Sequence, residues 1–460
     1  MYTRRRSSWK RKTQRRPWLL IIVLLLIGVP IGLELLTRLV VQLAGLTDEL
    51  TADRSGEAEI VEAYKLGFLN PDGQPYDELP NQGELLAVRD PLMGYHLRPD
   101  QKNSFWTINS QGFRDEEPVA IEKPPGEVRI FVLGGSTAFG QLNSNNQATF
   151  ASQLEKLLNE RVTGQQNNPD RYQPATLPYR ADQVEQALAL PPRISEQPYR
   201  VVNAAVPGYA SGNELSLLVQ HVAEYNPDML IVLNSYSDLM LPSSHDGVDI
   251  PGLDALIEGE EESIGSEITA SVQNWFNRLY SVRVYQHYIL QSQEKPPEQL
   301  IPLNMLTVNP GHPIDKTLAT DDAELNRRVS RYRSHMLQIV QWSSATRKRL
   351  FVGLQPEITG RSPDAMTPEE KAILAKLGNT YTERVQLGYT KLAEVADQTV
   401  KSSANARLLN LYKLYETYEG QAFQNPTSLT DEANGVLAKR FFDAIAAELA
   451  LQPKPFGAIE

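Results

Sequence analysis

The chain has 460 residues, of which 41% are hydrophobic and 22% are charged. These proportions allow a sizeable core and exclude wholesale disorder or a long coiled coil. The absence of cysteine excludes disulfide scaffolds, thiolate metal sites and a cysteine nucleophile. The net charge of −11 is uneven, because the first 16 residues hold eight Lys/Arg and no acid, which leaves 37 basic and 56 acidic residues elsewhere. An acidic body argues against nucleic-acid binding, although the basic tail alone could be a nucleic-acid arm.

An apolar segment follows this tail. Residues 18–33 carry no charge, and further apolar residues beyond Glu34 extend the segment to residue 41, close to the roughly 20 residues that span a bilayer. We expect a basic cytoplasmic tail at 1–17, a single transmembrane helix at 18–41 and an extracytoplasmic main domain, by the positive-inside rule. A cleaved signal peptide and a core helix are the alternatives. A signal peptide would need small residues where Glu34 and Arg38 stand.

The exported part begins with an extracytoplasmic linker or N-terminal region, 42–127, which contains an ordered turn at 109–114. Apolar runs typical of buried parallel strands then occur at 128–133, 201–206, 229–234, 350–354 and 406–411. Segments of helical periodicity separate and follow them at 149–162, 213–225, 327–342, 367–400 and 430–449. This alternation predicts an α/β fold over 128–450, a three-layer sandwich around a central parallel sheet, with a tail at 451–460. Two insertions interrupt it, at 163–199 and 243–318, and the second contains a helix candidate at 275–290.

The first strand ends in Gly134-Gly135-Ser136-Thr137. This sequence is neither a P-loop, which needs Gly-Lys-Ser/Thr, nor a G-x-G-x-x-G dinucleotide motif. A serine after two glycines at a strand end can be a nucleophile, because the glycines let a substrate approach and the following amide can join an oxyanion hole. The alternative is that Ser136 only caps the next helix.

In chain order, these motifs resemble those of the SGNH (GDSL-like) hydrolases. Gly134–Thr137 is similar to the nucleophile block, and the segment 203–211 resembles the second block, whose glycine, here Gly208, donates its backbone amide to an oxyanion. The resemblance covers about 128–450 outside the insertions and implies a flavodoxin-like sheet. It also implies hydrolysis or transfer of acyl esters, often on carbohydrate or lipid.

The remaining blocks depart from the family pattern. The third block of the family is Gly-x-Asn-Asp, and Ser237 stands at the position of the oxyanion asparagine. The fourth block is Asp-x-x-His, and here Asn425 stands at the aspartate position and Ser428 at the histidine position. Neither residue can take a proton from Ser136 near neutral pH. The spacing of Ser428 and Asp431 indicates helix capping instead.

Another histidine could replace the missing base. We expect His245 to be the best candidate, because it follows the third strand and therefore lies towards the carboxyl edge of the sheet. His221 and His335 fall within predicted helices and are interpreted as surface or core residues. No cluster has metal-ligand spacing, so we expect neither a metal nor a cofactor.

Two functions from different classes remain open. In the first, the chain is a degenerate, membrane-anchored relative, a pseudoenzyme that binds an envelope glycan, a lipid or a protein partner without turnover. In the second, it is an active carbohydrate- or lipid-ester hydrolase or acyltransferase with Ser136 as nucleophile and an unconventional base. The replaced Asp-x-x-His block favours the first.

Overall fold

The structure of the 460-residue chain is a computed structural model. It describes residues 59–75, 83–244, 301–303, 305 and 314–457. No helix within these residues is long and apolar enough to cross a membrane. The predicted transmembrane helix at 18–41, His245 and the helix candidate at 275–290 lie outside them. The described residues all belong to one compact unit.

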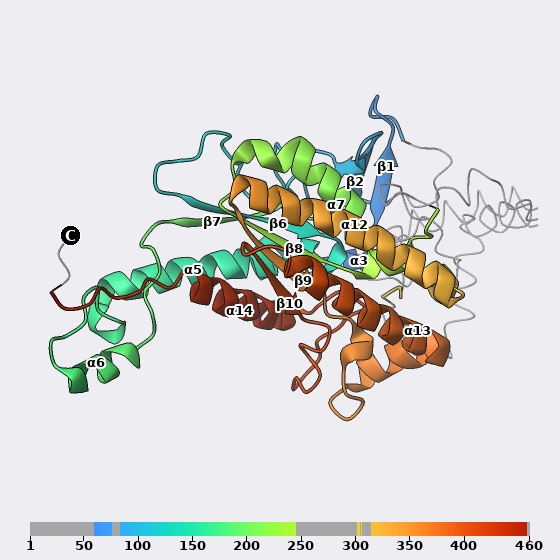
Figure 1. The fold of residues 1–460 in the computed structure, drawn as a ribbon. Helices are drawn as coiled ribbons and strands as arrows, with labels where there is room; N and C mark the ends of the chain where they lie inside the picture. Colours follow the sequence, from blue (N-terminus) through green and yellow to red (C-terminus); the bar gives the residue numbers. More distant parts are fainter. Residues whose placement is uncertain (1–58, 76–82, 245–300, 304, 306–313, 458–460) are drawn as a thin grey trace, which may run out of the picture. The chain divides into compact units, whose positions relative to one another are not determined.

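A five-stranded parallel sheet forms the centre of this unit, in the order β10-β9-β8-β6-β7 (Figure 1). Its strands are β6 (Val128–Gly134), β7 (Tyr199–Asn203), β8 (Met229–Asn234), β9 (Arg349–Leu354) and β10 (Ala406–Asn410). The three inner strands, β6, β8 and β9, are buried almost throughout, which explains why they read as continuous apolar runs. The predicted α/β fold with a central parallel sheet is confirmed, and the strand order is the flavodoxin-like one.

Helices cover both faces of the sheet (Figure 1). On one face α7 (Ser211–Leu217) packs against α12 (Asp322–Thr346), which in turn packs against α13 (Pro368–Val400). On the other face α5 (Phe150–Asn167) packs against α14 (Asp431–Glu448). Helix α13 begins with the predicted capping box, in which Thr367 accepts from the Glu370 N–H and Glu370 accepts from the Thr367 N–H. Two one-turn helices, α4 (Ser136–Phe139) and α8 (Tyr236–Met240), follow β6 and β8 directly.

The described part of the region 42–127 is folded. It contains α3 (Glu59–Tyr64) and a small sheet of β1 (Leu66–Leu69), β2 (Leu85–Asp90) and β3 (Gly94–Leu97). A two-stranded ladder follows, formed by β4 (Gln101–Lys102) and β5 (Thr107–Ile108). The insertion at 163–199 likewise contains the end of α5 and a short helix, α6 (Ala181–Leu188).

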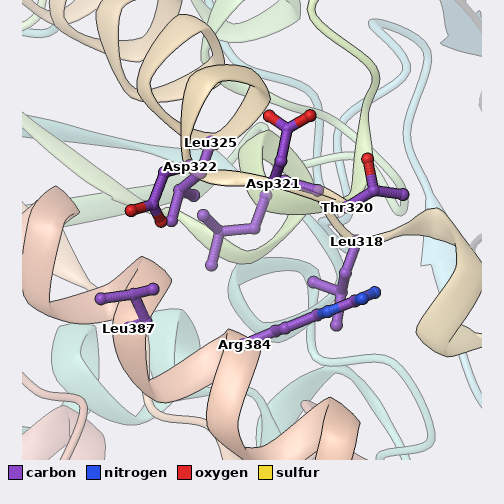
Figure 2. Close-up of a pocket in the computed structure, with 9 residues that line it drawn as sticks. Leu318, Thr320, Asp321, Asp322, Leu325, Arg384 and Leu387 are labelled. Carbon is purple, nitrogen blue, oxygen red and sulfur yellow. The ribbon is translucent and has the colours of Figure 1, made fainter.

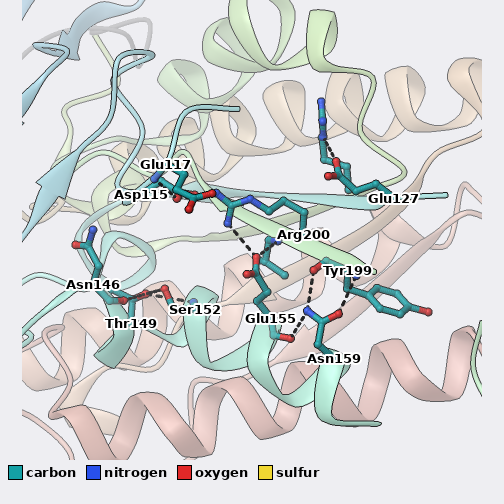
Figure 3. A network of polar contacts seen from close by, with 12 residues as sticks. Asp115, Glu117, Glu127, Asn146, Thr149, Ser152, Glu155, Asn159, Tyr199 and Arg200 are labelled. Atoms are coloured by element: carbon teal, nitrogen blue, oxygen red, sulfur yellow. Dashed lines mark hydrogen bonds and ion pairs between the residues drawn. The ribbon is translucent and has the colours of Figure 1, made fainter. Parts of the chain in front are cut away.

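Side chains close the exposed edge of β7. Asn159 bonds both the N–H and the carbonyl of Tyr199, and Glu155 accepts the N–H of Val201 at 2.6 Å. Arg200 lies between Glu155 and Asp115 (Figure 3). Because these groups occupy the hydrogen-bonding positions of a neighbouring strand, β7 can end the sheet without pairing to another chain.

Candidate functional site

The candidate site lies where the direction of strand connection reverses. The chain crosses from β6 to β7, which pairs along one edge of β6. The next strand, β8, pairs along the opposite edge of β6. In parallel sheets the crevice at such a switch point, at the carboxyl ends of the strands, is the usual ligand position. Ser136 follows β6 and Ser237 follows β8 at this point.

Ser136 is the first residue of α4 and is only 4% exposed. Gly134, at the end of β6, has a φ of +153°, and a Cβ there would lie 2.2 Å from the Leu233 carbonyl oxygen. Only glycine therefore fits the strand end. The Ser136 hydroxyl makes no hydrogen bond to any residue the structure describes, and α4 has no side-chain cap. Capping thus does not account for this serine.

Gly208 lies in the loop after β7, with a φ of +86°. The Tyr95 hydroxyl, from β3, would lie 2.5 Å from a Cβ at this position and donates to the Pro207 carbonyl at 2.7 Å. Tyr209 donates in turn to the Tyr95 carbonyl oxygen. The N-terminal sheet thereby holds the loop that was predicted to supply an oxyanion amide.

Ser237 lies in α8, and its Oγ is 3.5 Å from the position a Cβ would take on Gly135. The Tyr209 carbonyl oxygen is 3.0 Å from the same position. The loops of the first three blocks therefore meet around Gly135, immediately before Ser136. Ser235 adopts a φ of +120° at the start of this turn, which is an unusual conformation for a residue with a side chain.

The fourth block reaches the same edge. The Thr137 hydroxyl donates to the Thr427 carbonyl at 2.9 Å and accepts from Gln355 at 2.9 Å. Asn425 and Ser428, both buried, flank Thr427. The structure thus brings this segment next to α4. The roles assigned to these residues stay predictions.

The expected capping role of Ser428 is wrong. The N-cap of α14 is Thr430, whose hydroxyl accepts from the Ala433 N–H at 3.2 Å. Ser428 is fully buried, and its hydroxyl has no hydrogen-bond partner among the described residues. Instead, its backbone N–H donates to Asn425 Oδ1 at 2.7 Å, within a tight turn that Asn425 closes. The turn ends before the helix begins, so the cap lies two residues further along the chain.

The carboxyl end of β9 also contributes to this edge, although no motif indicated it. Besides the bond from Gln355, the Ile358 N–H donates to the Pro426 carbonyl. Between them Glu357 is completely buried and accepts from the Thr359 N–H and from the Tyr381 hydroxyl. Burial raises the pKa of Glu357 to about 7. The only feature of the sequence that could have indicated these residues is the Gln-Pro-Glu segment directly after a buried apolar strand.

His335 lies closer to the site loops than its helical position suggested. Its Nδ1 is 2.9 Å from the Ser211 hydroxyl, which donates to Asp238 at 2.5 Å. Asp238 follows Ser237, and burial raises its pKa, although Arg331 opposes this effect. The three side chains tie the first turn of α7 to α8. Within the described residues, His335 meets Ser211 rather than Ser136.

The described residues line at least two surface cavities. One, of about 140 Å³, lies between the start of α12 and α13, and its lining includes Asp321, Leu325 and Arg384 (Figure 2). The other, of about 420 Å³, lies beside β7 among the groups of Figure 3. Neither is lined by a predicted site residue. No group of three potential metal-ligating side chains occurs in the described ranges.

No protein-family model matches the chain, and no curated protein is significantly similar to it in sequence. Solved structures that it resembles include an acetyl xylan esterase, AlAXEase, with 9% identity, a TM-score of 0.34 and coverage of 69% of this chain and 100% of that one. The acetylxylan esterase Axe2 of Geobacillus stearothermophilus has 12% identity, a TM-score of 0.30 and coverage of 71% and 95%. A two-domain esterase (CEX) active on acetylated mannans has 10% identity, a TM-score of 0.32 and coverage of 71% and 52%.

At such low identities and TM-scores, no argument about the fold or the activity of this chain rests on these matches.

Proposed function

We propose that the chain is a membrane-anchored, extracytoplasmic SGNH-hydrolase-like protein that binds a glycan or lipid ester, or a protein partner, at the Ser136 edge without efficient turnover. The observation that carries this proposal is that the Ser136 hydroxyl has no hydrogen-bond partner in the described part of the chain. A serine becomes a nucleophile when a base within about 2.6–3.2 Å takes its proton, and the described residues supply none.

The residues at the positions of the base and its partner support the same conclusion. Asn425 uses its side-chain oxygen to accept two backbone N–H groups, from Thr427 at 3.0 Å and Ser428 at 2.7 Å. An amide cannot take up a proton near neutral pH, and the Ser428 hydroxyl is no better. The fourth block is therefore well ordered but chemically inert.

A second candidate function, an active ester hydrolase or acyltransferase, is favoured by the position of His245. In the sequence, this residue comes shortly after α8 (Tyr236–Met240), the helix that contains Ser237. It lies outside the described residues, as do His287 and His312. In this function, a base from that segment would take the proton of the Ser136 hydroxyl, for which the described residues offer no partner.

Labelling with a fluorophosphonate and hydrolysis of p-nitrophenyl acetate separate the two functions. We expect full-length protein in detergent to label no faster than its Ser136→Ala variant and to hydrolyse the ester barely above background, because loss of triad members costs roughly 10⁴–10⁶ in turnover. Brisk hydrolysis that both Ser136→Ala and His245→Ala abolish would establish the active enzyme instead.

Binding is tested separately from turnover. An acetylated oligosaccharide is titrated into the protein while tryptophan fluorescence is followed, with the deacetylated oligosaccharide as the matched control. Saturable binding of the acetylated form alone, weakened by Ser136→Ala, supports an ester-binding site at this edge. Equal binding of both forms contradicts it.

The proposed anchor has its own test. Eight basic residues before the apolar segment should hold the amino terminus in the cytoplasm. Protease added to intact spheroplasts should then digest the large domain. Survival of that domain until lysis would contradict the orientation.

A further inference from the structure

Arg114 ends the 109–114 turn and reaches the far end of the helix that begins with Ser136. It is only 3% exposed. One terminal nitrogen, Nη1, donates to the carbonyl oxygens of Phe139 at 3.0 Å and Gly140 at 2.7 Å. Nε donates to the Asn146 side chain at 2.9 Å, and Nη2 donates to the Tyr64 hydroxyl at 2.6 Å. The guanidinium therefore joins α3, α4 and the loop after α4.

This cation is buried without a carboxylate in ion-pair contact among the residues the structure describes. Burying a charge is costly unless other groups compensate it. Here the compensation comes from the negative end of the α4 backbone and from two aromatic rings, with the guanidinium carbon 4.8 Å from the Phe139 centroid and 5.2 Å from that of Tyr64. The charges of Asp431 and Glu116 also favour the cation, although neither is in ion-pair contact with it. The carbonyl groups of Phe139 and Gly140 and the Phe139 ring, which all stabilise the cation, thus belong to α4 or follow it directly.

Helix α4 needs such support because it is a single turn. A helix of four residues is not stable by itself, and no side chain caps its beginning. Its carbonyl end is held by Arg114 and by Asn203, whose amide donates to the Ala138 and Phe139 carbonyls at 3.2 Å each. Together with the bonds of Thr137 to Thr427 and Gln355, these contacts hold the one turn that carries Ser136.

We propose that Arg114 is a positioning residue of the candidate site, which fixes the carbonyl end of α4 and thereby sets the position of the Ser136 side chain. The inference rests on the proposed function in treating Ser136 as part of a site. The turn at 109–114 then supports the site, because it carries Arg114. Its Asn109 holds the turn closed by accepting from the Gln111 and Phe113 N–H groups.

The natural absence of cysteine permits a direct test of position. A Ser136→Cys variant carries the only thiol in the chain, and its alkylation by iodoacetamide, followed against pH, reports local exposure and thiolate formation without turnover or ligand. The full-length protein is used in detergent. Adding Arg114→Met should raise the alkylation rate roughly 10- to 100-fold, because α4 then opens without global unfolding. Its pH profile should move towards the pKa of a solvated thiol, about 8.5.

Two further variants, each made in the Ser136→Cys background, separate positioning from general stability. Arg114→Lys keeps the cation and can still donate to the α4 carbonyls, so it should give an intermediate rate. Arg129→Met removes an equally buried arginine that binds Glu127 and the Tyr225 carbonyl, away from α4. This control should lower the stability of the protein but leave the pH profile of alkylation unchanged.

Superimposable profiles with and without Arg114→Met would overturn the proposal. An equal rise in Arg129→Met would also overturn it, because thiol reactivity would then follow global stability. The alkylation assay needs no ligand, so it does not depend on the proposed function. That function fails in the separate binding experiment, if the acetylated oligosaccharide does not bind or binds independently of Ser136.

Discussion

Glu357 should make the stability of this protein fall as the pH rises from weakly acidic to neutral. Burial raises its pKa to about 7, whereas a solvated glutamate titrates near 4.5. Between these values the folded state keeps a proton that the unfolded state has lost, so the free energy of unfolding decreases with rising pH until the folded-state pKa is passed. Because a pKa difference of one corresponds to about 1.4 kcal/mol, the loss attributable to Glu357 is roughly 3 kcal/mol.

The variant Glu357→Gln isolates this contribution, since Asp238 and Glu214 also have raised pKa values and add to the slope of the parent. The glutamine oxygen can accept from Thr359 as the carboxylate does, and its amide can donate to the Tyr381 hydroxyl. Urea unfolding of the full-length protein, followed by tryptophan fluorescence between about pH 5 and 8, measures both proteins. The stability of the parent relative to the variant should decrease by roughly 2–3 kcal/mol across this range.

Tyr381→Phe provides a matched check. It removes a donor to the Glu357 carboxylate, and such a donor favours the charged form. The pKa of Glu357 should therefore rise further, and the pH window should move upward. A constant stability difference between the parent and Glu357→Gln at every pH would refute the reasoning.

Three further predictions concern the site loops. Thr430→Ala should cost about 1 kcal/mol of unfolding free energy because it removes the cap of α14. Ser428→Ala should cost measurably less in the same urea titration, because the Ser428 hydroxyl has no partner among the described residues. Gly208→Ala should cost roughly 1–3 kcal/mol, because φ is +86° and its Cβ would lie 2.5 Å from a tyrosine hydroxyl; an unchanged midpoint would contradict this. The combination of Ser428→His, Asn425→Asp and Ser237→Asn should hydrolyse p-nitrophenyl acetate faster than any of the single variants, because the base, its partner and the oxyanion donor act as a unit. Overpacking should lower the free energy of unfolding of this triple variant by roughly 1–3 kcal/mol. Equal activity of Ser428→His alone would contradict that interdependence.

Much of the fold could be predicted because its information is local. The apolar run at 229–234 coincides with β8, and the capping box at Thr367 marks the start of α13. Helix 213–225 was less regular than its periodicity indicated: α7 ends at Leu217 and continues as a π-helical turn, Leu218–Val222, and a short 3₁₀ turn, Ala223–Tyr225. The cap of α14 was misplaced because both Ser428 and Thr430 are suitable capping residues, and only the path of the turn decides between them.

The sequence by itself determined the order of strands and helices and the serine that follows the first long strand. Buried parallel strands are continuous apolar runs, and a glycine-rich turn must follow where a side chain would strike the neighbouring strand. From the resemblance, the sequence also predicts that the fourth block lacks an acid and a base.

Only the tertiary structure decided which side chains far apart in the sequence meet. Arg114 meets α4, His335 meets Ser211, and Tyr381 meets Glu357 across separations of 24 to 124 residues. No local pattern records such contacts, because they depend on how the helices pack on the sheet and not on the spacing of residues along the chain. The same packing buries Glu357 and raises its pKa, which its neighbours in the sequence could not have indicated.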